Sequence, residues 1–336
     1  MARLNNYDFL RIVAAISVIV SHQFALFGLP EPLVLTYQTL GGFGVLVFFS
    51  ISGYLIGQSW SSDPHLGRFA ARRMLRIWPA LICVVLVCLF IVGPIFTSDP
   101  LSDYFASHVT WSYLKNLIFV FQPFLPGVFS NSPVAYVPNG VYWTLPLEVA
   151  CYGLVAVLGI FGVMRSGWLL ATLVGLVSYW YYIYYDAQAK ILGGGERYYL
   201  VQYGTFFFYG ALLAKFKPWW IDRKLGCVTI ILFSGALLYL CGAKLLAIFV
   251  TLPFLINAFG EISTPVINRF GRYGDPSYGL YIYAFPVQQI VLSLLGRDGF
   301  FAEKLLLVIA ISLCISLVSW RFLEKPALRL KPSRKL

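Results

Sequence analysis

Two ionisable side chains, His22 and Glu148, stand inside long apolar stretches of this sequence. Ionisable groups at membrane depth are costly to bury, so each indicates a function unless a partner explains it. An imidazole titrates near neutral pH, and a close carboxylate increases its basicity. The pair therefore suggests a general base with an orienting or charge-balancing carboxylate. The alternative is a buried ion pair that only holds two helices together.

A third polar side chain precedes His22 on the same apolar stretch. Arg11 lies eleven residues before His22. At 100° per residue, this spacing returns His22 to within about 20° of the Arg11 face of a helix. The axial separation is about 16 Å at 1.5 Å per residue. We therefore expect one helix to present a cation near the cytoplasm and an imidazole deep in the membrane, facing the same way.

Residue counts place the imidazole and the carboxylate at similar depth. A helix that begins near Gly140 carries Glu148 about 12 Å inward from the outer surface. His22 lies about 10 Å from the same surface, counted from Leu29. Trp143 lies on the helix of Glu148 and could form a wall of such a site.

Arginines gather before the third apolar stretch. Arg72 or Arg73 shares one side of a helix with Arg76, because the spacings are three and four residues. Guanidinium groups bind phosphates bidentately, so this group could clamp a phosphorylated cytoplasmic ligand. An anchor of the positive-inside type would look the same. The spacing alone leaves both interpretations open.

The elements that position these residues are membrane helices. The chain has 336 residues, of which 59% are hydrophobic and 12% are charged, and its mean hydropathy is +0.77. These values exclude a soluble domain, a disordered chain and a disulfide scaffold. A membrane span needs about 20 apolar residues. Ten runs approach that length: 7–29, 38–58, 77–97, 140–164, 167–185, 198–216, 225–242, 244–260, 277–296 and 303–323.

The fold class is therefore all-α, a polytopic membrane protein of about ten helices with both termini on one side. The formal charge is +11, from 25 Lys and Arg against 14 Asp and Glu. With a cytoplasmic N-terminus, 19 basic residues lie inside and six lie outside. This split predicts cytoplasmic termini by the positive-inside rule and removes nucleic acid as a partner. We expect one membrane domain over residues 1–336, without an appended soluble domain.

Other features bear less directly on chemistry. The six cysteines lie in apolar runs without a metal-binding spacing, so no metal site is expected. Glycines near residues 41–44 and at Gly53 favour close helix packing over contact with a ligand. The proline-rich connection 98–139 contains a short apolar piece, 113–124, of interfacial or re-entrant type. Aromatic residues could stack on sugars or form a membrane belt: Trp111, Tyr113, Tyr136, Tyr142, Tyr198 and Tyr199.

Six motifs in order resemble the membrane-bound acyltransferase family 3, the bacterial surface O-acyltransferases. The resemblance covers nearly the whole chain. The matching segments are Asp8-Phe9-Leu10-Arg11 with His22 (R-x10-H), Phe48 to Ile56 (FFxxSGFLI), Arg73 to Arg76 (R-x-x-R), Trp143 to Glu148 (W-x-L-x-x-E), Ser277 to Tyr283, and Glu324-Lys325-Pro326. The family's histidine near position 284 is replaced by Ala284 here.

The resemblance implies transfer of an acyl group, usually acetyl from cytoplasmic acetyl-CoA, to a hydroxyl of a surface or lipid-linked carbohydrate. It implies that His22 is the catalytic histidine, as base or acyl relay, and that Glu148 supports the site. The acyl-CoA would lie against Arg11, Arg72, Arg73 and Arg76, and the acceptor against Trp143, Ser52 and Tyr281. The expected location is a bacterial inner membrane. A proton-coupled transporter of a glycolipid or acyl carrier is the alternative, and the sequence lacks the related halves of many transporters.

Overall fold

The computed structural model describes residues 5–35, 38–183 and 196–332, which are mostly helical. Contacts divide the chain into two compact units. The first unit comprises Met1–Arg11, Val45–Phe69 and Leu147–Gly271, and the second comprises Ile12–Gly44, Ala70–Pro146 and Arg272–Leu336. Four α-helices among the described residues begin in one unit and end in the other: α1 (Tyr7–Leu26), α2 (Leu40–Ser62), α3 (Leu66–Val87) and α7 (Thr144–Ile160).

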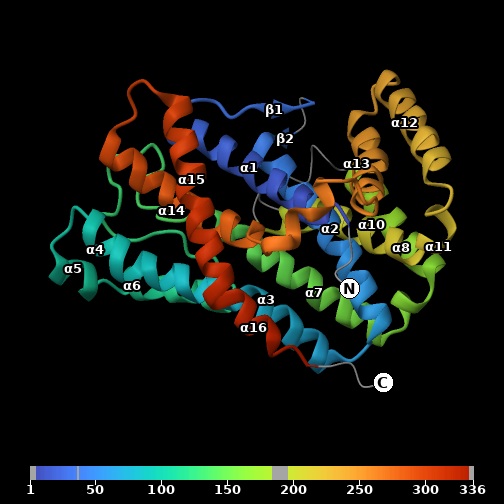
Figure 1. Cartoon of the computed structure of the whole chain (residues 1–336), viewed down its shortest axis with the longest axis horizontal. Coiled ribbons are helices and arrows are strands. Elements are labelled where there is room, and N and C mark those ends of the chain that lie inside the picture. Colours follow the sequence, from blue (N-terminus) through green and yellow to red (C-terminus); the bar gives the residue numbers. More distant parts are fainter. Residues whose placement is uncertain (1–4, 36–37, 184–195, 333–336) are drawn as a thin grey trace. The chain divides into compact units, whose positions relative to one another are not determined.

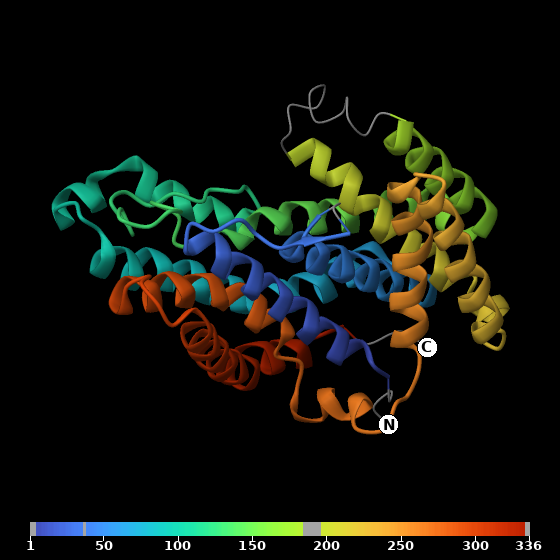
Figure 2. The same ribbon diagram turned by 90° about the horizontal axis from the view of Figure 1, so that it is seen from above.

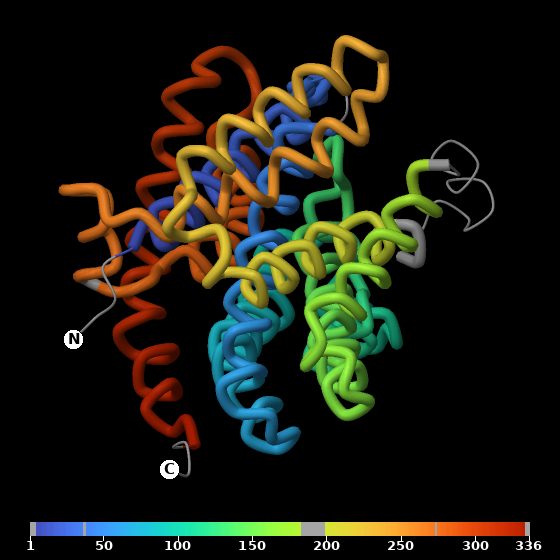
Figure 3. Tube along the Cα trace, turned by 90° about the vertical axis from the view of Figure 1, so that its right-hand side faces the viewer, coloured from blue at the N-terminus to red at the C-terminus, as the bar shows by residue number. Residues whose placement is uncertain are grey.

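The first unit adds a series of shorter helices to its parts of α2 and α7. α12 and α13 form a hairpin whose arms lie side by side (Figures 2 and 3). α10 packs against both α8 and α13. The helices are η4 (Val163–Arg165), α8 (Gly167–Ile183), α10 (Glu196–Lys215), α11 (Lys217–Trp220), α12 (Lys224–Leu240), α13 (Lys244–Gly260) and most of η5 (Ile267–Tyr273).

Two glycines let α2 and α10 approach closely in the first unit. A side-chain carbon on Gly53 would overlap the carbonyl oxygen of Phe207 on α10. Gly210 faces the carbonyl oxygen of Ser50 in the same way. Small residues allow such backbone contact between membrane helices. The structure confirms helix packing as the use of Gly53.

The second unit contains the end of α1 and is built around α14, which lies beside α15 (Figure 1). Two short strands, β1 (Leu33–Val34) and β2 (Gln38–Thr39), pair antiparallel. The helices are η1 (Cys88–Val92), α4 (Gly93–Phe96), α5 (Leu101–Ala106), α6 (His108–Ser112), η2 (Tyr113–Ile118), η3 (Val141–Trp143), α14 (Ser277–Leu295), α15 (Phe301–Ser319), η6 (Trp320–Glu324) and α16 (Lys325–Arg329).

Six helical segments among the described residues are long and apolar enough to cross a membrane. They are Tyr7–Leu26, Leu40–Ser62, Leu66–Phe96, Val141–Ile160, Ser277–Leu295 and Phe301–Arg329. The other four predicted runs fall on α8, α10, α12 and α13, and α12 and α13 are apolar but only 17 residues long. Residues 184 and 185 of the predicted run 167–185 lie outside the described residues.

The aromatic residues of the connection between α4 and α7 divide into two groups. Tyr113 and Tyr142 are buried, with exposed fractions of 0% and 1%, so neither of the two alternatives, sugar stacking or a membrane belt, applies to them. Their rings pack on each other, with centroids 6.0 Å apart. Trp111 and Tyr136 are exposed, each at 46%. Of these four residues, the second pair keeps an aromatic face for an external ligand.

Candidate active site

The candidate catalytic histidine lies near the end of α1. His22 is four residues before Leu26, where the helix ends three residues earlier than the sequence suggested. Its half-buried ring meets the ring of Phe285 on α14 edge to face, with centroids 5.1 Å apart at 81°. Phe285 in turn packs on the backbone of Gly140. Within the described part of the chain, the imidazole makes no hydrogen bond, so its nitrogens remain available for proton transfer.

Two buried amides tie α14 to the same part of α1. Nε2 of Gln288 donates to the carbonyl oxygen of Ile19 and to Oε1 of Gln23, each at 2.9 Å. Gln23 and Gln288 are both fully buried. The next residue, Gln289, donates to the carbonyl oxygens of Val134 and Val137. Sequence reasoning missed these amides, although two consecutive glutamines in an apolar run were a visible signal.

Tyr281 of α14 forms hydrogen bonds with the start of α7 and the turn before it. Its hydroxyl group lies 2.7 Å from Oγ1 of Thr144 and donates to the carbonyl oxygen of Val141 at 3.2 Å. Trp143 lies in η3 between these two partners and is half-buried. The structure thus brings Tyr281 into the same local cluster as the segment that carries Trp143.

Glu148 has its own partners in the first unit. It lies four residues after Thr144, the first residue of α7. Its Oε1 accepts hydrogen bonds from Oγ of Ser52 at 3.4 Å and from the hydroxyl group of Tyr152. Ser52, which lies on α2, therefore orients the Glu148 carboxylate. Because His22 belongs to the second unit, the expectation that the imidazole and the carboxylate act together stays a prediction.

Arg11 pairs within its own turn of α1. Its Nη1 lies 3.2 Å from Oδ1 of Asp8, three residues earlier. Both side chains are partly exposed, so the pair holds Arg11 loosely. Arg11 and His22 share one helix, as the sequence predicted, and the eleven steps from one to the other correspond to about 16 Å along α1.

The arginines on α3 have different surroundings. Arg76 meets two carboxylates: its Nη2 lies 2.5 Å from Oδ2 of Asp275, and its Nη1 lies 3.5 Å from Oε2 of Glu324. The rings of Tyr278 and Trp320 lie within 6 Å of the same guanidinium group. Such a group is held in place on all sides. Arg76 therefore joins α3 to α14 and η6.

Arg72 and Arg73 lie one turn before Arg76. Arg72 is buried, with 9% of its surface exposed, and Arg73 is half-buried. The positive charges of Arg73, Arg76 and Arg72 act on Lys331, beyond the end of α16, and burial together with these charges lowers the pKa of Lys331 to about 8. A cluster whose charges depress a neighbouring lysine is a favourable place for an anion.

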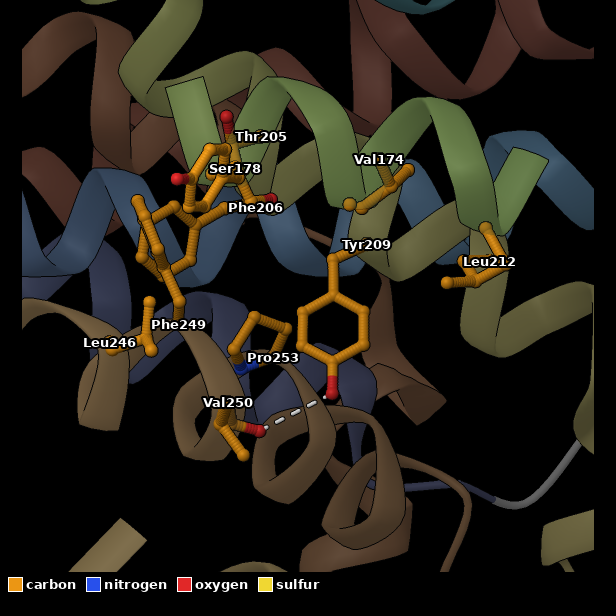
Figure 4. Close-up of a pocket in the computed structure, with 13 residues that line it drawn as sticks. Val174, Ser178, Thr205, Phe206, Tyr209, Leu212, Leu246, Phe249, Val250 and Pro253 are labelled. Carbon is orange, nitrogen blue, oxygen red and sulfur yellow. Dashed lines mark hydrogen bonds between the residues drawn. The ribbon is translucent and has the colours of Figure 1, made fainter. Parts of the chain in front are cut away.

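A cavity of about 330 Å³ lies in the first unit between α8, α10 and α13 (Figure 4). Its wall is mainly apolar, and two of its hydroxyl groups donate to backbone carbonyl oxygens. The hydroxyl group of Tyr209 donates to the carbonyl oxygen of Val250 at 3.3 Å, and that of Thr205 to the carbonyl oxygen of Val201 at 2.8 Å. The cavity contains none of the residues that the sequence proposed for chemistry.

Comparison with known proteins identifies the family. A family profile described as "Acyltransferase domain" matches residues 4–321, which extend over both units. The chain is 32% identical to an "O-acetyl transferase" of Shigella phage Sf6, over 97% of this chain and 96% of the relative. It is 26% identical to "Nodulation protein 10" of Rhizobium leguminosarum bv. viciae, over 98% and 94%. No solved structure matches. The chain belongs to the acyltransferase family 3, and the protein is a multi-pass membrane acyltransferase.

Proposed function

We propose that the protein transfers an acetyl group from cytoplasmic acetyl-CoA to a hydroxyl group of a surface or lipid-linked carbohydrate. The observation that carries this proposal is the full-length similarity to a relative named O-acetyl transferase. The alignment extends over 97% of this chain and 96% of the relative. The donor and the acceptor follow from the family resemblance of the sequence motifs.

His22 is the general base of this reaction. Its imidazole removes the proton of the acceptor hydroxyl group while that oxygen attacks the thioester carbonyl carbon. The proton then passes to the sulfur as the carbon–sulfur bond breaks, which yields the ester and free CoA. The edge contact with Phe285 holds the ring and leaves both nitrogens without a hydrogen bond among the described residues.

The donor binds at the arginines on α3. Acyl-CoA carries several phosphate groups, and guanidinium groups bind phosphate in a fork geometry. Arg72 and Arg73 contact these phosphates, and Arg11 serves the same side. Arg76, already engaged by Asp275 and Glu324, positions this turn of α3.

The remaining sequence expectations belong to the same proposal. Glu148 keeps the supporting role that the resemblance implies. Trp143, Ser52 and Tyr281 serve the acceptor. The chain crosses a bacterial inner membrane about ten times with cytoplasmic termini, and α8, α10, α12 and α13 supply the crossings beyond the six long spans.

Acetyl transfer is tested with the purified protein in lipid nanodiscs. Free thiol released from acetyl-CoA is measured with and without surface glycan, and the glycan is then analysed for an added acetyl mass. We expect His22→Gln to reduce the transfer rate by about 10²–10⁴, the usual contribution of a general base. The matched control is His108→Gln, because His108 is an exposed histidine at the start of α6.

Two results would contradict the proposal. Acetyl transfer by His22→Gln at the parental rate would remove His22 from the chemistry. Absence of any thiol release by the parental protein with every surface glycan offered would remove acetyl-CoA as donor. An acetylated His22 peptide trapped before acceptor addition would replace the base by an acyl-enzyme relay.

A further inference from the structure

The amide cluster beside His22 leaves one hydrogen-bond donor unused. Nε2 of Gln23 is buried and has no hydrogen-bond partner among the residues that the structure describes, and the same is true of Oε1 of Gln288. A buried N–H group without a partner is unfavourable and uncommon in native structures. An unpaired carbonyl oxygen is less unusual. The free amide nitrogen of Gln23 therefore requires an explanation.

The orientation of this amide follows from its neighbours. The carbonyl oxygen of Ile19 can only accept a hydrogen bond, so the group of Gln288 that faces it must be Nε2. The same Nε2 also donates to Gln23, so the atom of Gln23 that faces it must be Oε1. The free atom of Gln23 is then its nitrogen. Gln288 thus fixes the Gln23 amide with its Oε1 towards α14 and its Nε2 unused.

The free donor lies next to the candidate base. Gln23 follows His22 directly on α1, so their side chains leave the helix about 100° apart. α14 contacts both side chains, because Phe285 touches the His22 ring and Gln288, one turn later, donates a hydrogen bond to Gln23. The base and the unused N–H group therefore flank the same helix at the same level of α1.

We propose that Nε2 of Gln23 donates a hydrogen bond to the carbonyl oxygen of the transferred acyl group. This inference rests on the proposed function. When the acceptor oxygen bonds to the carbonyl carbon and its proton moves to His22, the carbonyl electron pair moves onto the oxygen. Gln23 stabilises that negative charge until the carbon–sulfur bond breaks and the thiolate takes the proton from the imidazolium. Gln23 is thus a catalytic residue and Gln288 a positioning residue.

The test compares two isosteric changes at buried glutamines. Gln23→Met removes the proposed donor, and Gln289→Met is the matched control, because Gln289 is equally buried and follows Gln288 on α14. We expect Gln23→Met to reduce kcat about 100- to 1000-fold, as does loss of one oxyanion donor elsewhere. The KM values for acetyl-CoA and acceptor should stay within threefold. Thiol release to water, without acceptor, should fall by the same factor.

Thermal stability separates the chemical role from a structural one. Gln23→Met removes an unpaired buried N–H group while Gln288 keeps its bond to Ile19, so its Tm should equal or exceed the parental value. Gln289→Met should lower Tm, because it leaves two loop carbonyls without a donor, but it should keep kcat within threefold. A stable Gln23→Met protein with little activity is the signature of the proposal.

Other outcomes overturn it. Parental kcat in Gln23→Met would exclude Gln23 from the reaction, and a rise in the acceptor KM alone would assign Gln23 to the acceptor hydroxyl. If Gln23→Met does not fold, Gln288→Met tests the proposal instead, because loss of the Gln288 amide allows the Gln23 amide to rotate. Its kcat should fall at least tenfold, and a parental value would contradict the proposal. If His22→Gln is inactive and both Gln23→Met and Gln288→Met are active, only this inference is wrong. If His22→Gln is active, the proposed function is wrong.

Discussion

Two buried polar clusters lie along α14, and they are satisfied in opposite ways. Near its start, Arg76 faces the carboxylates of Asp275 and Glu324, so each of these three charges has an opposite charge within 3.5 Å, although Oε2 of Glu324 makes no hydrogen bond among the described residues. Further along, Gln23 and Gln288 share one hydrogen bond and leave a donor and an acceptor unused. Both clusters join α14 to another helix of the second unit.

The difference follows from what each kind of group costs to bury. A buried charge without a partner is severely destabilising, so a charged cluster persists only when it is paired. A neutral amide without a partner costs about 1–3 kcal/mol, which a folded protein can tolerate. Unused hydrogen-bonding capacity therefore indicates a place where binding or chemistry supplies the missing partner. By this argument, the charged cluster holds the fold and the amide cluster serves the reaction.

Removal of Arg76 tests whether the charged cluster holds the fold, and it should have the largest effect on stability. Arg76→Ala removes the cation that the buried Glu324 carboxylate faces, and we expect a loss of about 3–5 kcal/mol in the free energy of unfolding. Denaturant unfolding in detergent micelles measures it. The control is Arg329→Ala, an exposed arginine on α16, which should change stability by less than about 0.5 kcal/mol. If the Arg76→Ala protein is fully stable and its KM for acetyl-CoA is raised, Arg76 binds the donor instead of holding the fold.

Removal of Arg73 tests whether one turn of α3 holds both a structural and a binding arginine. Arg73→Ala should raise the KM for acetyl-CoA about tenfold, since a charge-assisted hydrogen bond contributes about 1.5–3 kcal/mol. The effect should be absent with acetyl-phosphopantetheine, which lacks the adenosine phosphates. Arg329→Ala again controls for the general positive charge of this face. An equal KM change with both donors would show that Arg73 does not contact those phosphates.

The sequence predicted the helical membrane class, the family and the shared helix of Arg11 and His22. These depend on apolar run length and on residue spacing, which are local properties of the chain. The number of spans was harder to predict, because α12 and α13 are apolar yet short. Apolar composition shows that a helix is buried somewhere, but it does not separate burial in lipid from burial in protein.

The partners of the candidate site were less accessible from the sequence. Arg76 and Asp275 are separated by 199 residues, and Gln288 and Gln23 by 265. No local pattern states which side chains such distant segments bring together. Glu324 was interpreted as part of a structural ending, and its burial against Arg76 depends on the π-helical turn Trp320–Glu324, which has no simple sequence signal.

The smallest expected effect concerns Lys331 at the edge of the charged cluster. Burial and the charges of Arg73, Arg76 and Arg72 lower its pKa from 10.5 to about 8. Between pH 8 and 10.5 the unfolded chain holds a proton that the folded protein has lost, so stability rises with pH in this window. Below pH 8 the charged lysine weakens the fold. Lys331→Met should therefore raise Tm slightly at pH 7, and this gain should shrink towards pH 10.

The same lysine should act in the opposite direction on the donor. Protonated Lys331 adds a positive charge beside Arg72 and Arg73 and so favours the phosphates of acetyl-CoA. As pH rises from 7 to 9, the parental KM for acetyl-CoA should rise about twofold, whereas Lys331→Met should show a flat profile at the higher value. Identical pH profiles for the two proteins would exclude Lys331 from the donor site. If Lys331 both lowers the stability of the protein and improves donor binding, it follows the rule inferred for Gln23. A group that the fold leaves without a favourable partner then finds that partner in the substrate.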